Sequence, residues 1–337
     1  MLTDRYQRPL QDLRISVTDR CNFRCTYCMP LDHYDWIAKS QILSYEEIRR
    51  LVAIFAQLGV SKVRITGGEP LLRRDLPDLV AMLSGIEGIQ DLCLTTNGSL
   101  LADKAASLRE AGLNRVTVSI DSLNPQTFAR MAQRGNLESV LEGVAAAGRA
   151  GLSPIKVNAV LERGVNDHEI AELLAYARSH GYEMRFIEFM DVGNVNGWSS
   201  SKLVDKDEIL RRVAAVHPFR RPTSARGSAP SERYTFLDGQ GSFGVIASVT
   251  EPFCGACTRI RLTADGRLVT CLFSTGGHDI KSLLRSGASD EDLRRTIAEV
   301  WSGRSDRYSE ERLVAISSAE GYHPDSVRKI EMISLGG

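Results

Sequence analysis

The sequence has no surplus of either charge, since 42 lysines and arginines balance 42 aspartates and glutamates. Without a basic surplus the chain has no global field that attracts nucleic acid or anionic membranes, so neither is expected as a partner. It also has no apolar run near the roughly 20 residues of a membrane span. The first five residues lack the basic and apolar regions of a secretory signal, and a cytoplasmic protein is therefore expected.

Cysteine is scarce, with seven residues in 337, and its distribution is uneven. Hydrophobic residues (43%) and charged residues (25%) have ordinary proportions for a globular protein, whose core needs no disulfides. Under reducing conditions clustered cysteines more often bind metal or carry out redox chemistry. Six of the seven fall into two triplets, whereas Cys93 stands alone among strand-like residues and is expected to be a small buried core residue.

Short strand-like runs alternate with longer helical patterns up to residue 190, which is typical of repeated βα units. Six parallel strands with right-handed crossovers form a barrel or a part of one. The predicted fold class is therefore α/β, with a partial (β/α)6 barrel of TIM type over residues 1–190. The strands are expected at residues 13–17, 62–66, 92–96, 115–120, 155–160 and 184–189. The helices between them are expected at residues 45–58, 76–83, 101–110, 137–149 and 168–179.

Six βα units are fewer than the eight of a closed barrel, so a gap along one side has to be covered. Residues 191–337 are expected to do this as a C-terminal α+β region. Its helices are expected at residues 205–216, 279–286 and 290–302, and its strands at 234–237, 243–246, 259–263 and 268–271. Ala264-Asp265-Gly266 predicts a hairpin turn between the last two strands.

The first cysteine triplet, Cys21, Cys25 and Cys28, follows the first expected strand with the spacing C-x3-C-x2-C. In βα barrels the loops at the C-terminal ends of the strands carry the active site. A [4Fe–4S] cluster normally takes four thiolates, so three leave one iron with a position open to a small molecule. Structural zinc would need a fourth ligand, for which His33 is awkwardly placed.

The second triplet lies near the end of the chain and consists of Cys254, Cys257 and Cys271. Its spacing alone favours half of a zinc ribbon, with His278 as a possible fourth ligand. The neighbouring Arg259 and Arg261 change this interpretation, because side chains at positions i and i+2 of a strand share one face. Two guanidinium groups beside a cluster suit the oxygens of a phosphate.

The first triplet resembles the hallmark of the radical S-adenosylmethionine (SAM) enzymes. Gly67-Gly68-Glu69-Pro70, after the second expected strand, matches the element with which that superfamily contacts the methionine amino group of SAM. Taken alone it would be a turn. Because it comes one βα unit after the triplet, we interpret it as functional.

The motifs together resemble, nearly from end to end, the GTP 3′,8-cyclase family of molybdenum cofactor biosynthesis. The likeness covers residues 12–25, 64–70, 94–98 and 185–194, the second triplet and the final two glycines. It is looser between residues 218 and 231, and Leu335 stands where isoleucine is expected.

The resemblance implies two [4Fe–4S] clusters, one on each triplet, with SAM on the first and the guanine of GTP on the second. The residues that it implies for SAM are Tyr27, Gly68, Ser119 and Met190. The residues that it implies for GTP are Arg14, Arg64, Thr95, Lys156, Arg259, Ile260 and Arg261. It implies catalytic roles for Arg14, Arg259, Arg261, Gly336 and Gly337, the two glycines belonging to a slender tail that enters the active site.

The implied activity is that of a lyase that starts molybdopterin synthesis. SAM is cleaved to methionine and a 5′-deoxyadenosyl radical, hydrogen is removed from C3′ of GTP, and C3′ bonds to C8 of the guanine. The resemblance further implies a homodimer, an external electron donor and transfer of the product to cyclic pyranopterin monophosphate synthase. Two alternatives stay open: another two-cluster radical SAM enzyme, such as a peptide-maturing enzyme, and a non-catalytic nucleotide-binding module stabilised by zinc.

Overall fold

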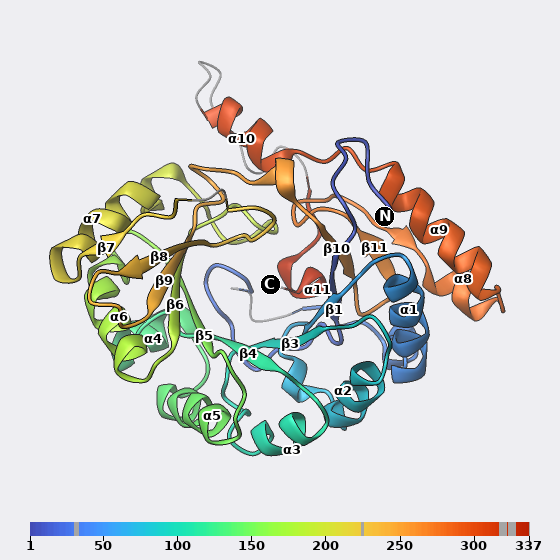
Figure 1. The fold of residues 1–337 in the computed structure, drawn as a ribbon, viewed down its shortest axis with the longest axis horizontal. Helices are drawn as coiled ribbons and strands as arrows, with labels where there is room; N and C mark the ends of the chain where they lie inside the picture. Colours follow the sequence, from blue (N-terminus) through green and yellow to red (C-terminus); the bar gives the residue numbers. More distant parts are fainter. Residues whose placement is uncertain (30–33, 224–225, 317–321, 323–327, 337) are drawn as a thin grey trace.

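The computed structural model describes residues 1–29, 34–223, 226–316, 322 and 328–336. Within them lies a twelve-stranded sheet with the order β12-β11-β10-β1-β2-β3-β4-β5-β6-β9-β8-β7. Figure 1 shows the sheet curving around a central space, with helices on its outer side. No helix of the described part of the chain is long and apolar enough to cross a membrane.

The six N-terminal strands are parallel and are neighbours in chain order, as predicted for a partial barrel. They are β1 (Asp12–Ser16), β2 (Lys62–Thr66), β3 (Asp91–Thr96), β4 (Arg115–Ser119), β5 (Lys156–Leu161) and β6 (Glu183–Glu188). The helices outside them are α1 (Tyr45–Gln57), α2 (Leu76–Ser84), α3 (Ala105–Glu110), α4 (Pro125–Ala132), α5 (Leu137–Arg149) and α6 (Ile170–Ser179). The expected core position of Cys93 on β3 is confirmed, since its side chain is fully buried.

Helix α4 is the element of this half that the helical periodicity does not predict. Asn124 caps it by accepting hydrogen bonds from the backbone N–H groups of Gln126 and Thr127. Pro125 occupies the first turn, where its missing N–H leaves no hydrogen bond unmade. The Asn-Pro pair is therefore the local signal for this short helix.

The C-terminal strands extend the sheet from both of its edges. Strand β9 (Ser242–Ile246) pairs parallel with β6, and β10 (Arg259–Leu262) pairs parallel with β1. The antiparallel additions are β8 (Glu232–Phe236) and β7 (Phe219–Arg220) beyond β9, and β11 (Arg267–Val269) and β12 (His278–Asp279) beyond β10. The expected division at residue 190 stays a prediction, because strands from both sides of it share this sheet.

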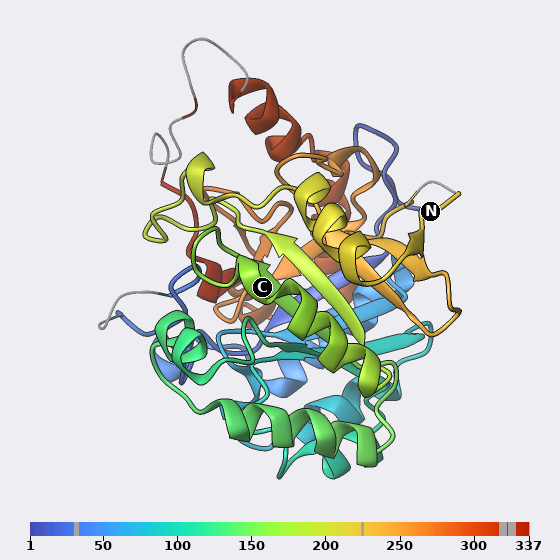
Figure 2. The ribbon, with the colours of Figure 1, turned by 90° about the vertical axis from the view of Figure 1, so that its left-hand side faces the viewer.

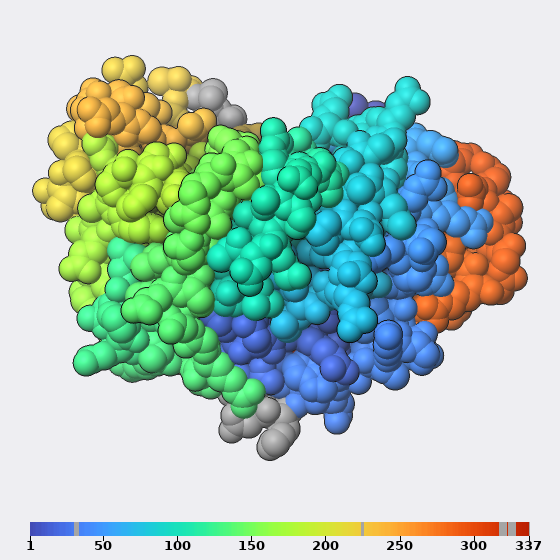
Figure 3. Space-filling view, turned by 90° about the horizontal axis from the view of Figure 1, so that it is seen from below, coloured from blue at the N-terminus to red at the C-terminus, as the bar shows by residue number. Residues whose placement is uncertain are grey.

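The remaining helices lie around these added strands. They are α7 (Lys206–Val216), α8 (Lys281–Arg285), α9 (Asp290–Ser302), α10 (Tyr308–Ile316) and α11 (Met332–Leu335). The view from below shows the outer surface passing from yellow-green through green and cyan to blue, with orange C-terminal segments beside the blue ones (Figure 3). After the turn of the view in Figure 2, α10 stands at the end of the barrel away from α5.

The tail that follows α10 returns to the middle of the barrel. In Figure 1 helix α11 lies near the centre, beside β1. Gly336 follows it with φ +68°, and a Cβ atom there would lie 2.2 Å from Cγ2 of Thr66 on β2. A glycine is therefore required at this position. Gly337 lies outside the described residues.

Candidate active site

The barrel holds a cavity of about 640 Å³ whose wall contains both cysteine triplets. Ten of the other residues predicted for the site line it as well: Arg14, Tyr27, Arg64, Gly68, Thr95, Ser119, Lys156, Met190, Arg259 and Arg261. Ile260 does not, because it alternates with the two arginines and its side chain is fully buried in the core. A contact between the Ile260 side chain and a ligand in the cavity is thus not supported.

The two triplets lie at opposite edges of the β1–β10 strand pair. Cys21 follows the C-terminal end of β1, whereas Cys257 precedes β10, which runs parallel to β1. The antiparallel strand β11 then brings the chain back, since Val269 pairs with Arg261. Cys271 consequently ends beside the edge where Cys257 lies, and the cavity extends between the two triplets.

The loop of the first triplet is held in a tight turn. The carbonyl oxygen of Cys25 accepts hydrogen bonds from the N–H groups of Cys28 (3.0 Å) and Met29 (2.8 Å). Burial, together with Asp121 and the neighbouring thiols, raises the pKa of Cys25. Burial also raises the pKa of Cys28 to about 12. Three partly buried thiols thus lie close enough to influence one another's ionisation.

Gly68 packs directly against this loop. Its N–H group donates to the carbonyl oxygen of Thr18 at 2.7 Å, and the N–H group of Glu69 donates to that of Arg20 at 2.8 Å. A Cβ atom on Gly68 would lie 2.3 Å from the carbonyl oxygen of Arg20. The glycine therefore allows the end of β2 to pack closely against the cysteine loop. This structural role does not depend on a contact with SAM.

Glu69 is a buried carboxylate at the same edge of the sheet. It accepts hydrogen bonds from the hydroxyl group of Thr96 (2.7 Å) and from the N–H groups of Asn97 (2.7 Å) and Leu71 (3.0 Å). Burial raises the pKa of Glu69 to about 7, although these donors oppose the shift. Its bonds join the ends of β2 and β3 beneath the cysteine loop.

Asp121 lines the cavity directly after β4 and is a residue that the sequence analysis does not identify. The Tyr27 hydroxyl group donates to its Oδ2 at 2.7 Å, and the N–H group of Val160 donates to its Oδ1 at 2.9 Å. Burial raises the pKa of Asp121 to about 6. Its place at the C-terminal end of a barrel strand is the signal that could have revealed it.

Arg304 supports the second triplet. Its Nη1 atom donates to the carbonyl oxygen of Cys257 at 2.8 Å, and its Nη2 atom donates to Sγ of Cys257 at 3.2 Å. Burial acts to raise the pKa of Cys257, but Arg259 and Arg304 outweigh it and lower the pKa to about 7. Arg304 has no signal in the sequence, because it lies far along the chain in a segment without a motif.

Three cysteines without a histidine are an incomplete ligand set for structural zinc. No histidine is among the described residues that line the cavity, and His278 is exposed on β12. Within the described ranges no three or more His, Cys, Asp or Glu side chains are placed to hold a single metal ion. His33 lies outside the described residues. Three thiols on one cavity wall are the ligand set of a cluster that keeps one iron open.

A layer of arginines crosses the cavity between the triplets. Arg14 on β1 is in register with Arg261 on β10 and with Arg64 on β2. Burial, followed by the charges of Arg261, Arg64 and Arg259, lowers the pKa of Arg14. None of these four arginines forms an ion pair with a described carboxylate. Cations that repel one another without counter-ions favour an anionic ligand.

Further polar groups continue this layer onto the next strands. Arg64 donates from Nη1 to the hydroxyl groups of Thr95 (2.8 Å) and Thr117 (3.2 Å). Lys156 lies on β5 with its Nζ atom 3.7 Å from a carboxylate oxygen of Glu183. Arg185 on β6 also lines the cavity, and only its alternation along the strand could have indicated it.

The comparisons with known proteins agree with this arrangement. The model of the radical SAM superfamily matches residues 15–177, and the model named Molybdenum Cofactor Synthesis C matches residues 182–310. The GTP 3′,8-cyclase of Acidothermus cellulolyticus is 49% identical over 100% of this chain and 99% of its own length. The chain belongs to the GTP 3′,8-cyclase family. The family member from Aquifex aeolicus is 47% identical and both chains are covered completely.

Other members and more distant structures extend the comparison. The GTP 3′,8-cyclase of Xanthomonas axonopodis pv. citri is 46% identical over 100% of this chain and 99% of its own. The crystal structure of Streptococcus suis SuiB bound to S-adenosylmethionine has a TM-score of 0.62 and 15% identity, and covers 91% of this chain and 68% of that chain. That structure shares the fold. As a radical SAM protein, a member of the GTP 3′,8-cyclase family is an enzyme that uses a [4Fe–4S] cluster and SAM.

Proposed function

We propose that the chain is a radical SAM GTP 3′,8-cyclase of the lyase class. It would convert GTP to (8S)-3′,8-cyclo-7,8-dihydroguanosine 5′-triphosphate, the first step of molybdenum cofactor biosynthesis. The observation that carries the proposal is a single cavity with a cysteine triplet at each end and, between them, arginines that form no ion pair with a described carboxylate. This order of groups suits a nucleotide whose base and phosphates need different partners.

The first triplet and its neighbours would serve SAM. Cys21, Cys25 and Cys28 would hold a [4Fe–4S] cluster that supplies, when bound, the electron for reductive cleavage of SAM. Around it, SAM would lie against Tyr27, Gly68, Ser119 and Met190. Asp121 fixes the Tyr27 hydroxyl group, so the ring is held in place before a ligand binds.

The second triplet and the arginine layer would serve GTP. Cys254, Cys257 and Cys271 would hold a second [4Fe–4S] cluster with an iron open to the guanine. A triphosphate carries roughly four negative charges, which only converging cations can hold away from water. Those cations are Arg14, Arg64, Lys156, Arg259 and Arg261, with Thr95 as a further polar contact. The chain's own task is to orient C3′ of the ribose and to exclude water.

The proposal also includes features that rest on the family resemblance. They are a division into residues 1–190, which cleave SAM, and 191–337, which carry the second cluster and the tail. They further include a cytoplasmic homodimer, an external electron donor and hand-over of the product to cyclic pyranopterin monophosphate synthase.

The decisive experiment uses GTP labelled with deuterium at C3′. Anaerobically reconstituted protein is incubated with SAM, dithionite and the labelled GTP, and both products are analysed by chromatography and mass spectrometry. We expect deuterated 5′-deoxyadenosine together with a nucleotide in which C3′ is bonded to C8. Cleavage of SAM without transfer of the label would favour another radical SAM activity. Colourless protein with zinc, in place of about eight irons, would favour the binding module.

The affinity for GTP is expected to fall as the pH rises through 8. Burial and the charge of Arg185 lower the pKa of Lys156 to about 8, so this amine is charged below that pH and neutral above it. Because the charged form binds phosphate, GTP affinity should be highest at pH 7 and fall by roughly tenfold by pH 9. Equilibrium binding of GTP measures this. Lys156→Arg is the matched control, because a guanidinium group stays charged and should flatten the profile.

A further inference from the structure

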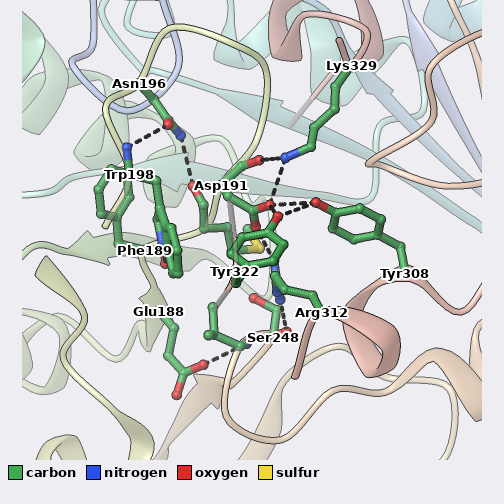
Figure 4. A network of polar contacts seen from close by, with 12 residues as sticks. Glu188, Phe189, Asp191, Asn196, Trp198, Ser248, Tyr308, Arg312, Tyr322 and Lys329 are labelled. Carbon is green, nitrogen blue, oxygen red and sulfur yellow. Dashed lines mark hydrogen bonds and ion pairs between the residues drawn. The ribbon is translucent and has the colours of Figure 1, made fainter. Parts of the chain in front are cut away.

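Asp191 is a fully buried carboxylate in the loop after β6, directly after Met190. Figure 4 shows it at the centre of a polar network surrounded by side chains from the C-terminal part of the chain. Its Oδ2 atom accepts hydrogen bonds from Nζ of Lys329 and from the hydroxyl group of Tyr308, both at 2.7 Å. The Arg312 guanidinium and the Tyr322 hydroxyl group also donate to it.

This network lies behind an apolar wall. Phe189 and Trp198 are buried, and the ring of Tyr322 packs edge-on against that of Trp198 with the centroids 5.7 Å apart. Ion pairs are stronger where water is excluded. Burial acts to raise the pKa of Asp191, but Arg312 and Lys329 outweigh it and lower the pKa to about 2. The carboxylate is therefore charged and held between two cations.

The loop after β6 binds the C-terminal tail through a second set of hydrogen bonds, at residues 329 and 331. Nζ of Lys329 donates to the carbonyl oxygen of Asp191 at 2.8 Å. The Asn194 side chain donates to the carbonyl oxygen of Lys329 and accepts from its N–H group, both at 2.7 Å. It also donates to Oε1 of Glu331 at 2.6 Å. Residues 329–331 are thus fixed immediately before α11 begins.

The far end of α11 contacts the arginine layer. Nη1 of Arg261 donates to the carbonyl oxygens of Leu335 (3.1 Å) and Gly336 (2.5 Å). Met332 at the start of α11 lines the cavity. Because α11 is only four residues long, its entry point at residue 331 determines where these two carbonyl groups lie. A chain of contacts therefore joins Asp191 to Arg261.

We propose that Asp191 is a positioning residue: it anchors the C-terminal tail so that the carbonyl groups of Leu335 and Gly336 orient Arg261 in the cavity. The inference rests on the proposed function in one respect, because Arg261 is taken there to bind GTP. Asp191 itself touches no ligand in this mechanism. Asp191 should affect GTP affinity only by fixing the position of the tail.

The test replaces Asp191 by asparagine, which keeps the shape and removes the charge. We expect backbone hydrogen exchange of residues 328–336 to become at least roughly tenfold faster, with β2 to β5 unchanged, and GTP to bind roughly tenfold more weakly. Asp238→Asn, which removes the exposed carboxylate that pairs with Arg178, is the matched control and should change neither quantity. Asn194→Ala is the alternative variant if Asp191→Asn fails to fold. It removes the hydrogen bonds of Asn194 to the tail and should give the same two effects, faster exchange and weaker GTP binding, to a smaller extent.

Removal of residues 328–337 separates the outcomes. If Asp191 acts through the tail, Asp191→Asn should no longer affect GTP affinity in the shortened protein. An equal loss of affinity in the full and shortened proteins would overturn the inference, as would unchanged exchange in the tail. Faster exchange of the tail in a protein that does not bind GTP would contradict the proposed function and leave the anchoring role standing.

Discussion

Replacement of Cys25 by serine is expected to reduce the formation of 5′-deoxyadenosine from SAM to the level of protein without a cluster. Cys25 lies in the centre of the first triplet, and its carbonyl oxygen also holds the turn that contains Cys28. A hydroxyl group in this partly buried place does not replace a thiolate as a ligand of iron. Two remaining thiols would not retain the cluster. Iron content and chromatographic analysis of 5′-deoxyadenosine under reducing conditions measure the effect.

Cys93→Ser is the matched control for this experiment. Cys93 is fully buried, lies outside both triplets and donates from Sγ to the carbonyl oxygen of Val63 at 3.5 Å. The control should keep its iron and its rate of SAM cleavage. A Cys25→Ser protein that formed 5′-deoxyadenosine at the rate of the unchanged protein would rule out the assignment of the first triplet.

Replacement of Arg14 by methionine should weaken GTP binding by roughly ten- to a hundredfold without lowering the stability of the ligand-free protein. A hydrogen bond to a charged group contributes about 1.5–3 kcal/mol, which corresponds to the loss of affinity. Stability should be unchanged or higher, because burial and the charges of Arg261 and Arg64 oppose the charge of Arg14. Opposite effects on binding and stability are typical of a residue kept for its ligand.

Equilibrium binding of GTP and thermal unfolding measure the two effects separately. Arg267→Met is the matched control, since Arg267 is exposed on β11 and pairs with Asp265 at 3.1 Å, outside the cavity wall. It should leave GTP affinity unchanged. If Arg14→Met bound GTP as tightly as the unchanged protein, the arginine layer would not be the phosphate site.

Local signals predict much of the N-terminal half. Alternating strands and helices give its six βα units, and Ser44 and Glu47 form a capping box at the start of α1, a signal that lies in the local sequence. The alternation rule that groups Arg259 with Arg261 turns the side chain of Ile260 into the core, and its predicted role at GTP stays a prediction. The roles of the other site residues stay predictions. Both triplets and ten further predicted residues line one cavity, whereas Gly336 is not part of its wall and Gly337 lies outside the described residues.

Pairings between distant segments have no local signal. The pairing of β10 with β1 joins segments that lie far apart in the sequence, and neither strand has a feature that selects the other. The Asp191 network is a similar case, since Tyr308 and Lys329 lie 117 and 138 residues further along the chain. Such contacts depend on the assembled fold. Each partner is an ordinary polar residue in the sequence, and only the folded barrel buries it away from water.

The attachment of β9 and β10 to opposite edges of the barrel bears on how the chain folds during its synthesis. Until β9 has left the ribosome β6 presents unpaired backbone groups to solvent, and β1 does so until β10 follows; such edges invite association with other chains. Residues 1–190 accordingly depend on later segments to cover both edges of their strands. The backbone groups at these two edges are paired only after β9 and β10 have joined the sheet.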